Sequence, residues 1–308
     1  MALASDGQGN HHFYLQQNQI AQLDFDQQEC RLNINGGTEY RLALNQLKRI
    51  CVEGSEQLKY QPSPHAEKIQ QCLQSLGITS GTCVDIGAFD GVNHSNTFQL
   101  FQAGWSGLAL EYEYCRFASL AHTYRAFPNV DLARVQVTPD NVCLLLQAHG
   151  IPHNFDFLSL DIDSYDYYVL AALLENFRPT LIMTEINEVI PPPVKFAVKY
   201  DRDFRFDVNK RFYGQSLAQL HELCQRKRYT ILDMYYMDVV LIDTDYLEGE
   251  APSLEDIYNR GLLTRGLPDY YANYPFDVRK LLAASPEQAL ELVCQGYGEF
   301  AGQFVCSL

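Results

Sequence analysis

The stretch CVDIGAFDGVNHSN, residues 83–96, follows an apolar run and places two acids and two glycines around one reversal of the chain. Gly87 and Gly91 let the backbone come close to a ligand, and the helix expected next offers free N–H groups to an anion. The stretch is therefore either an ordinary strand-to-helix turn or a pocket for a nucleotide-like cofactor. The residues that follow it decide between these two interpretations.

After this stretch, apolar segments of strand length alternate with helix-like segments. Near-continuous apolar strands separated by helices are typical of a parallel sheet that is buried on both faces. Residues 235–237 divide the last long apolar segment, which predicts a final hairpin. We therefore predict an α/β fold, doubly wound around a mainly parallel, seven-stranded sheet. The helix-like segments between the strands are 92–103, 114–126, 140–149, 165–176 and 214–227.

The two ends of the chain differ from this alternating region. Residues 1–62 are predicted to be an N-terminal extension that can form a short hairpin, with a tight turn at Asn35-Gly36-Gly37. Two prolines in QPSPH, residues 61–65, mark its boundary. The alternating domain then occupies residues 63–245. Residues 246–308 are aromatic and helical in pattern, and we expect them to form an extension that closes a pocket or makes a homodimer.

Composition and charge exclude several classes of function. The chain has 308 residues and a formal charge of −15, and such an acidic surface repels phosphate backbones, so we expect no nucleic-acid partner. No stretch approaches the roughly 20 apolar residues that span a bilayer, so we expect no membrane partner. The nine cysteines are dispersed without a CxxC pair, which predicts reduced thiols rather than a zinc site. The N-terminus does not resemble a signal peptide, and we therefore predict a cytoplasmic protein.

Two acidic positions indicate what kind of cofactor the glycine-rich turn would hold. The turn has the pattern D-x-G-x-x-x-G, beginning at Asp85, with Phe89 where a dinucleotide-binding turn has its second glycine. Glu111 ends the next predicted strand, at a spacing that suits a carboxylate bound to two ribose hydroxyls. Together these features predict an adenosine-containing ligand without a pyrophosphate.

A third acidic group lies at the end of the fourth predicted strand, in FDFLSLDIDSYDYYVL, residues 155–170. Asp163 or Ser164 could simply cap the following helix, and Asp166 could lie on its solvated first turn. Asp161 is embedded in an apolar run, where a lone buried carboxylate is costly without a partner. We therefore expect Asp161 to have a functional role.

The segments VDIGAFDGVNHSNTFQLFQAGWSGLALE, DFLSLDIDSYDYYVLAAL and IMTEIN resemble the class I S-adenosylmethionine-dependent methyltransferases, specifically the FkbM-like branch. The resemblance covers residues 83–243. It implies a Rossmann-like methyltransferase fold, with 63–245 as the catalytic domain and S-adenosylmethionine as cofactor. The cofactor-binding residues that it implies are Asp85, Gly87, Ala88 and Gly91 in the loop, Asn96 near the amino-acid end, Glu111 at the ribose, Thr138 at the adenine edge and Asp161 beside the reacting centre.

The chemistry of methyl transfer suggests further residues. A hydroxyl acceptor gains from a base within hydrogen-bond reach, and the candidates are Asp163, Glu185 and His94. Alternatively, Asp161, Asp163 and Glu185 could gather a hard divalent ion, with Mg²⁺ favoured over Ca²⁺, because such ions prefer oxygen ligands. Either arrangement would place the reacting group at the carboxyl edge of the sheet.

The acceptor pocket is predicted from an unusual excursion, residues 191–217, that begins with three prolines. Loops at this edge commonly define the substrate pocket, and we expect Tyr200, Phe212 and Tyr213 to line it. The sequence thus predicts O-methylation of a small molecule, a sugar or a secondary metabolite. The alternatives are N-methylation of a small amine, another enzyme that binds an adenosine ligand, and a non-catalytic subunit with the same fold.

Overall fold

The computed structural model describes the backbone of six strands between residues 2 and 53, and all of residues 63–308 apart from the side chains of residues 269 and 270. The chain divides into two compact units, residues 1–60 and 61–308. The second unit contains both the alternating region and residues 246–308.

The first unit contains two three-stranded sheets. One has the order β1-β2-β6, and the other has the order β3-β4-β5. β4 and β5 pair antiparallel on either side of residues 35–37, and the tight turn predicted there lies outside the described residues. The strands are β1 (Ala2–Ser5), β2 (His11–Gln16), β3 (Ile20–Phe25), β4 (Glu29–Ile34), β5 (Thr38–Ala43) and β6 (Leu47–Glu53).

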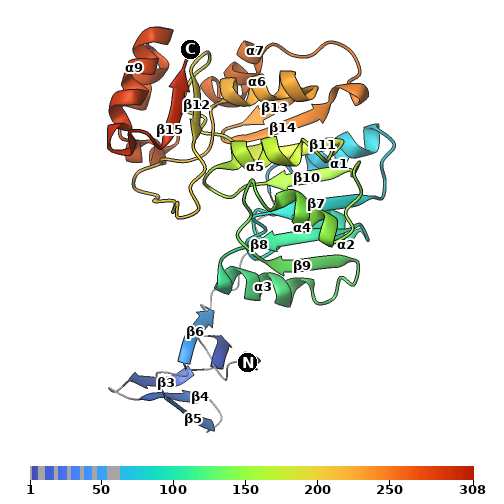
Figure 1. Cartoon of the computed structure of the whole chain (residues 1–308), viewed down its shortest axis with the longest axis vertical. Helices are drawn as coiled ribbons and strands as arrows, with labels where there is room; N and C mark the ends of the chain where they lie inside the picture. Colours follow the sequence, from blue (N-terminus) through green and yellow to red (C-terminus); the bar gives the residue numbers. More distant parts are fainter. Residues whose placement is uncertain are drawn as a thin grey trace. The chain divides into compact units, whose positions relative to one another are not determined.

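Seven strands of the second unit form one sheet in the order β13-β14-β11-β10-β7-β8-β9 (Figure 1). The five strands from β11 to β9 run parallel, and β14 lies antiparallel to both of its neighbours. This is the predicted doubly wound sheet, and it has the Rossmann-like methyltransferase fold. The strands are β7 (Thr82–Ile86), β8 (Ser106–Glu111), β9 (Val130–Arg134), β10 (Phe157–Leu160), β11 (Leu181–Glu185), β13 (Tyr229–Tyr235) and β14 (Asp238–Asp243).

Helices cover both faces of this sheet, and a separate apolar core lies under each set. Helices α1–α3 pack through residues such as Leu73, Phe101 and Leu120 against one face. Helices α4–α6 pack through residues such as Leu146 and Leu170 against the other. Burial on both faces explains why the strands read as continuous apolar runs. The helices are α1 (Ala66–Ser75), α2 (Phe98–Gln102), α3 (Tyr114–Tyr124), α4 (Val142–Ala148), α5 (Asp166–Leu173) and α6 (Leu217–Lys227).

Helix α2 is much shorter than the predicted segment 92–103. The Asp90 carboxylate accepts hydrogen bonds from the backbone N–H groups of Val92 and Asn93, both at 2.9 Å. Such local side-chain bonds satisfy the backbone without a helix, and the chain therefore turns before α2 begins. The predicted hairpin is present, because β13 and β14 are joined through Tyr236, which has a φ of 51°.

The C-terminal residues pack on the excursion that follows β11. Strand β12 (Lys195–Val198) pairs antiparallel with β15 (Phe304–Ser307). The chain between them includes α7 (Leu254–Tyr258), α8 (Val278–Leu282) and α9 (Pro286–Gly296), which lies beside β15 in Figure 1. Ser285 begins α9 with a capping box in which Gln288 takes part. Because of this strand pairing, the tail holds the excursion in place.

The sequence led to two expectations that bear on residues 63–308: the lack of a membrane-spanning stretch and the reduced state of the cysteines. No helix in the described part of the chain is long and apolar enough to cross a membrane. All nine cysteines were expected to be reduced. This expectation is wrong for Cys115, which is disulfide-bonded. The free thiols are Cys72, Cys83, Cys143, Cys224, Cys294 and Cys306.

Candidate functional site

A cavity of about 700 Å³ lies at the carboxyl edge of the parallel strands. Asp85 from β7, Glu111 from β8 and Asp161, which follows β10, all line it. The sheet order reverses between β7 and β10, and ligands of doubly wound sheets bind at such a switch point. The three strand ends that the sequence singled out therefore meet at one site.

Asp85 is buried at the inner wall of the cavity, with an exposed fraction of 4%. Burial raises the pKa of Asp85 to about 6, and the hydroxyl of Thr97, which donates to its Oδ2 at 2.6 Å, works against that shift. Nearby, the Asn96 side chain donates to the hydroxyl of Ser159 at 3.2 Å. This wall therefore combines a buried carboxyl with an amide, a pair suited to an ammonium and carboxylate ligand.

Gly87 makes the close approach of β7 and β10 possible. Its φ is +91°, and a Cβ atom added there would lie 1.7 Å from the carbonyl oxygen of Asp161. The next residues in the loop are also constrained, because Phe89 has a φ of 51°. Strained backbone of this kind is concentrated at binding and catalytic sites. The glycine-rich turn is therefore shaped by strand packing as well as by the cavity.

Glu111 is held by the backbone on both of its oxygens. The N–H groups of Phe89 and Glu113 donate to Oε2 at 3.0 Å and to Oε1 at 2.5 Å. Burial raises the pKa of Glu111, and these backbone bonds oppose that rise. The backbone of Tyr112 also bonds to this side chain. An ionised carboxylate offers about four acceptor positions, so Glu111 keeps acceptor capacity for a ribose hydroxyl.

Three carboxylates converge at the floor of the cavity. One oxygen from each of Asp161, Asp163 and Glu185 lies within 4.8 Å of the others. Desolvation and the charges of neighbouring carboxylates raise the pKa of Glu185, which is buried, well above its usual range. The charges of Asp163 and Asp166 shift the pKa of Asp161 in the same direction, although Asp161 is exposed to the cavity. Burial also raises the pKa of Asp163, whereas the charges of Arg116 and Arg211 oppose the rise. Of the three carboxylates, Asp163 is therefore the one whose ionised form is stabilised by nearby arginines.

Asp166 supports the turn that carries Asp163. Its side chain is fully buried and accepts hydrogen bonds from the N–H groups of Ile162 at 2.9 Å and Ser164 at 3.0 Å. The alternative of a solvated first-turn residue is therefore wrong for Asp166. Asp163 itself has a φ of 54°, a conformation that Asp and Asn tolerate better than most residues.

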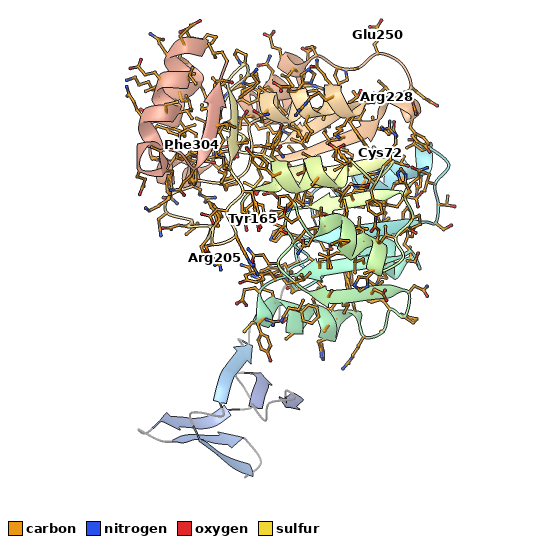
Figure 2. All side chains as sticks on the ribbon, in the orientation of Figure 1. Cys72, Tyr165, Arg205, Arg228, Glu250 and Phe304 are labelled. Carbon is orange, nitrogen blue, oxygen red and sulfur yellow. The ribbon has the colours of Figure 1, made fainter. Side chains whose placement is uncertain are left out.

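The excursion after β11 covers the cavity on the side of β8 and β9. Phe204, Arg205 and Phe206 line the cavity, and the Arg205 guanidinium lies 5.7 Å from the ring centre of Tyr112. The Gln136 side chain donates to the carbonyl oxygen of Arg202 at 2.8 Å. Figure 2 labels Arg205 and Tyr165, and both line the same cavity. The excursion is thus a lid over the part of the site near Glu111.

The structure brings most of the predicted residues to the cavity but not all of them. Gly91 packs against helix α3 instead. A Cβ atom added at Gly91 would lie 2.7 Å from Leu120, and the Tyr124 hydroxyl donates a hydrogen bond to the carbonyl oxygen of Gly91. Thr138 is buried beside Val137, which does line the cavity. Glu185 lies behind the floor. The predicted residues that line the cavity are Asp85, Gly87, Ala88, His94, Asn96, Glu111, Asp161 and Asp163.

Of the three residues expected at the acceptor pocket, Phe212 and Tyr213 are buried and Tyr200 is partly buried. Phe212 is 2% exposed and stacks on Phe300, with ring centres 4.0 Å apart. Tyr213 is 1% exposed and donates to the carboxylate of Glu188 at 3.2 Å. Tyr200 contacts the ring of Tyr165 edge-on, with ring centres 4.9 Å apart. None of the three is among the lining residues. For Phe212 the reason is that the C-terminal tail supplies the aromatic ring of Phe300 that covers it.

Several lining residues have no counterpart among the predictions. Arg116, Tyr112 and the lid residues line one end of the cavity, and Ser63 and Asp238 line it as well. Asp238 lies 2.9 Å from the Nε2 atom of His65, which is 173 positions away along the chain. The aromatic residues of the lid could be recognised in the sequence. The pairing of His65 with Asp238 could not be predicted, because the two residues are far apart in the chain and share no local sequence pattern.

Known proteins resemble this chain in structure and not in sequence. No family model matches the chain, and no curated protein matches it. The N-terminal domain of EvdMO1 with SAH bound is 14% identical over 65% of this chain and 87% of that chain, with a TM-score of 0.41. The METTL16 MTase domain is 13% identical over 60% of this chain and 67% of that chain, with a TM-score of 0.39.

A further solved structure of this kind is the ribosomal protein L11 methylase from Lactobacillus delbrueckii subsp. bulgaricus. It is 12% identical over 57% of this chain and 76% of that chain, with a TM-score of 0.34. These likenesses concern the fold alone. The functional argument therefore depends on the strand order and on the residues of the cavity.

Proposed function

We propose that this chain is an S-adenosylmethionine-dependent methyltransferase that acts on a small molecule. One observation carries the proposal: Asp85, Glu111 and Asp161, from three different strand ends, line the same cavity of about 700 Å³. A cavity of this size suits a cofactor together with a small acceptor. The FkbM-like branch and a cytoplasmic location remain part of the proposal.

The residues of the cavity fit this cofactor at both of its ends. The remaining acceptor capacity of Glu111 suits a ribose hydroxyl, and the carboxyl of Asp85 and the amide of Asn96 suit the ammonium and carboxylate of a methionine moiety. Gly87 and Ala88 provide the wall between these ends. When bound, the cofactor would supply a methyl group on a positively charged sulfur.

The acceptor that we propose is a hydroxyl of a sugar or secondary metabolite, with a small amine as the nearest variant. Asp163 lines the cavity, and its carboxylate would accept the proton that the hydroxyl loses. His94 also lines the cavity and is the second candidate for this role. Methyl transfer chiefly requires alignment of donor and acceptor, and a lid that orders the site serves this purpose.

Ligand titration of the full chain tests the cofactor assignment. We expect S-adenosylmethionine and S-adenosylhomocysteine to raise the unfolding temperature, and NAD⁺ to leave it unchanged. Glu111→Ala should weaken cofactor binding by about 10–100-fold, since it removes charge-assisted hydrogen bonds worth roughly 1.5–3 kcal/mol. Glu248→Ala, at an exposed position outside the cavity, is the matched control. A preference for NAD⁺, or an unchanged affinity in the Glu111 variant, would contradict the proposal.

A further inference from the structure

Asp238 lies at the edge of the sheet where the parallel strands end. β14 runs antiparallel to β11, so its first residue, Asp238, pairs with Glu185, the last residue of β11. Asp238 lines the cavity, whereas Glu185 does not. Neighbouring strands are about 4.8 Å apart and β14 is the third strand from β7, so Asp238 lies about 14 Å along this edge from Asp85. Because β8 is the other neighbour of β7, Asp238 and Glu111 lie on opposite sides of Asp85.

The buried ring of His65 holds Asp238 in place. The Nε2 atom of His65 lies 2.9 Å from Oδ2 of Asp238, and the exposed fractions of the two side chains are 4% and 25%. An ionised carboxylate only accepts hydrogen bonds, so the ring is the donor. Tyr235 packs edge-on against this ring, with ring centres 5.3 Å apart. The Oδ1 atom of Asp238 makes no hydrogen bond within residues 63–308, and Asp238 therefore keeps one oxygen for a ligand.

The structure of helix α1 does not by itself explain a histidine at position 65. His65 is the N-cap residue of α1, but its side chain makes no capping bond, which is the usual role of Ser, Thr, Asp or Asn there. An ion pair between Lys68 and Asp233 already attaches α1 to the hairpin of β13 and β14. Neither of these two residues lines the cavity, whereas Asp238 does. The bond from His65 therefore differs from the ion pair of Lys68 in that it reaches the cavity.

Ser63 connects this end of the cavity to the wall that carries Asn96. Its hydroxyl accepts a hydrogen bond from the N–H of His65 at 3.1 Å and donates one to Oδ1 of Asn96. Ser63 and the neighbouring Pro64 both line the cavity. The proline-containing segment at the start of the alternating domain therefore supplies part of the site as well as a boundary.

Positive charge lines the cavity only on the side of β7 and β8. Among the described residues, the lysines and arginines that line it are Arg116 and Arg205, which lie over aromatic rings that follow β7 and β8. Arg211 acts on Asp163 but is not a lining residue. At the end of the cavity near β14, Asp238 is paired with the ring of a histidine alone within residues 63–308. A negatively charged ligand group is disfavoured there, and a hydrogen-bond donor is favoured.

We propose that Asp238, positioned by His65, binds a hydroxyl or ammonium group of the acceptor other than the group that receives the methyl. This inference rests on the proposed function, because it places the acceptor between Asp238 and the bound cofactor. Asp238 touches the acceptor, and His65 acts only through Asp238. The acceptor class is thereby narrowed to compounds with a second hydrogen-bond donor and no negative charge beside it, such as a polyol or an amino sugar. Hydrogen bonds to an ionised carboxylate are about twice as strong as neutral ones.

Three monosaccharides with the same ring test this subsite. D-glucosamine carries an ammonium group, D-glucose carries only hydroxyls, and D-glucuronate carries a carboxylate. The full chain is titrated with S-adenosylhomocysteine by calorimetry, and then with each sugar in its presence. We expect D-glucosamine and D-glucose to bind and D-glucuronate to bind about 10-fold more weakly or not at all. Tighter binding of D-glucosamine identifies an ammonium group as the occupant, and equal binding of the first two sugars identifies a hydroxyl.

Variants separate the roles of the two residues. Asp238→Asn should weaken D-glucosamine binding about 10–100-fold, the range for a lost hydrogen bond to a charged group. His65→Phe should weaken it about 3–10-fold, and His65→Gln, whose amide can donate to Asp238, should restore it. Both His65 variants change the packing against Tyr235, so rescue by Gln is not expected of a purely structural role. Asp233→Asn, which removes the partner of Lys68 on the same hairpin but outside the cavity, should leave sugar binding unchanged.

The inference is overturned if none of the sugars binds at millimolar concentration, if D-glucuronate binds as tightly as D-glucosamine, or if Asp238→Asn binds as the wild type does. Unchanged affinity in both His65 variants rejects the positioning role of His65. Unfolding temperatures are measured first, and Asp238→Asn and His65→Gln decide if His65→Phe does not fold. Binding of S-adenosylhomocysteine without binding of any sugar rejects the subsite and keeps the methyltransferase. If S-adenosylhomocysteine does not bind, the proposed function fails, and titration of the free protein with the sugars still decides on the subsite.

Discussion

The cofactor side of the cavity and the lid above it differ in how they are built. On the cofactor side, Asp85, Glu111 and Asp161 lie at the ends of strands, and short segments such as 83–96 fix their surroundings. In the lid, the excursion of residues 191–217, the orientation of the side chains depends on partners far away in the chain, such as Phe300 for Phe212. Local geometry therefore defines the first region, and long-range packing defines the second.

The largest effect that this comparison predicts is at Gly87. Gly87→Ala places a Cβ atom 1.7 Å from the Asp161 carbonyl oxygen, so β7 and β10 would have to separate, and we expect the chain to lose its fold or its cofactor binding. Gly104 has the same φ of +91° with nothing within 4 Å of an added Cβ. Gly104→Ala should therefore cost only about 1–2 kcal/mol, from its backbone conformation alone.

Chemical denaturation of both variants measures the difference in the free energy of unfolding. Equal losses of stability would show that the contact with Asp161 does not matter and that only the left-handed backbone does. The cofactor-binding constant of whichever variant folds then separates a packing role for Gly87 from a binding role.

The second prediction concerns turnover. Asp163→Asn keeps a residue that tolerates a φ of 54°, so we expect fold and cofactor affinity to be retained. Removal of the proton acceptor should lower kcat about 10²–10⁴-fold with a hydroxyl acceptor. Asp201→Asn, on the lid surface, is the comparison variant. A turnover equal to that of the wild type would transfer the role of base to His94.

The third prediction separates the two kinds of lid residue. Phe212→Ala leaves a hole beside Phe300 and should lower the free energy of unfolding by about 3–5 kcal/mol. Arg205→Ala removes a side chain that lines the cavity above Tyr112, and it should instead weaken cofactor binding with little loss of stability. Thermal unfolding and cofactor titration of both variants measure the two effects. If Phe212→Ala weakened cofactor binding and left stability unchanged, Phe212 would contact the ligand, contrary to this prediction.

The same contrast explains how much of the molecule the sequence could predict. The seven strands and the meeting of Asp85, Glu111 and Asp161 follow from apolar periodicity and from the rule that parallel strands end at one edge. The lid could be located from its prolines and its lack of periodicity. Which of its aromatic rings turn inward depends on the pairing of β12 with β15, about a hundred residues apart, and no local pattern shows this.

The smallest predicted effect is a pH dependence that tests the cofactor side without any change to the lid. Burial raises the pKa of Asp85 to about 6 from 3.8. Between these values the folded state binds more protons than the unfolded state, so the free energy of unfolding should fall as pH rises from about 4 to about 6. The loss attributable to Asp85 is at most about 3 kcal/mol, since one pKa unit corresponds to about 1.4 kcal/mol.

Asp166 has the same direction of shift, with a pKa that burial raises to about 6, and it contributes a parallel loss. Asp85→Asn should therefore remove part of the pH dependence and leave the part that belongs to Asp166 and to the other carboxyls with a raised pKa, among them Glu111 and Glu185. Urea denaturation at pH 4.5, 5.5 and 6.5 measures both slopes. Cofactor binding should change in the opposite sense, because the ionised carboxylate that weakens the free protein is the form that holds an ammonium group. If stability rises with pH over this interval and Asp85→Asn leaves the slope unchanged, Asp85 does not ionise in the way that its burial and its cofactor role require.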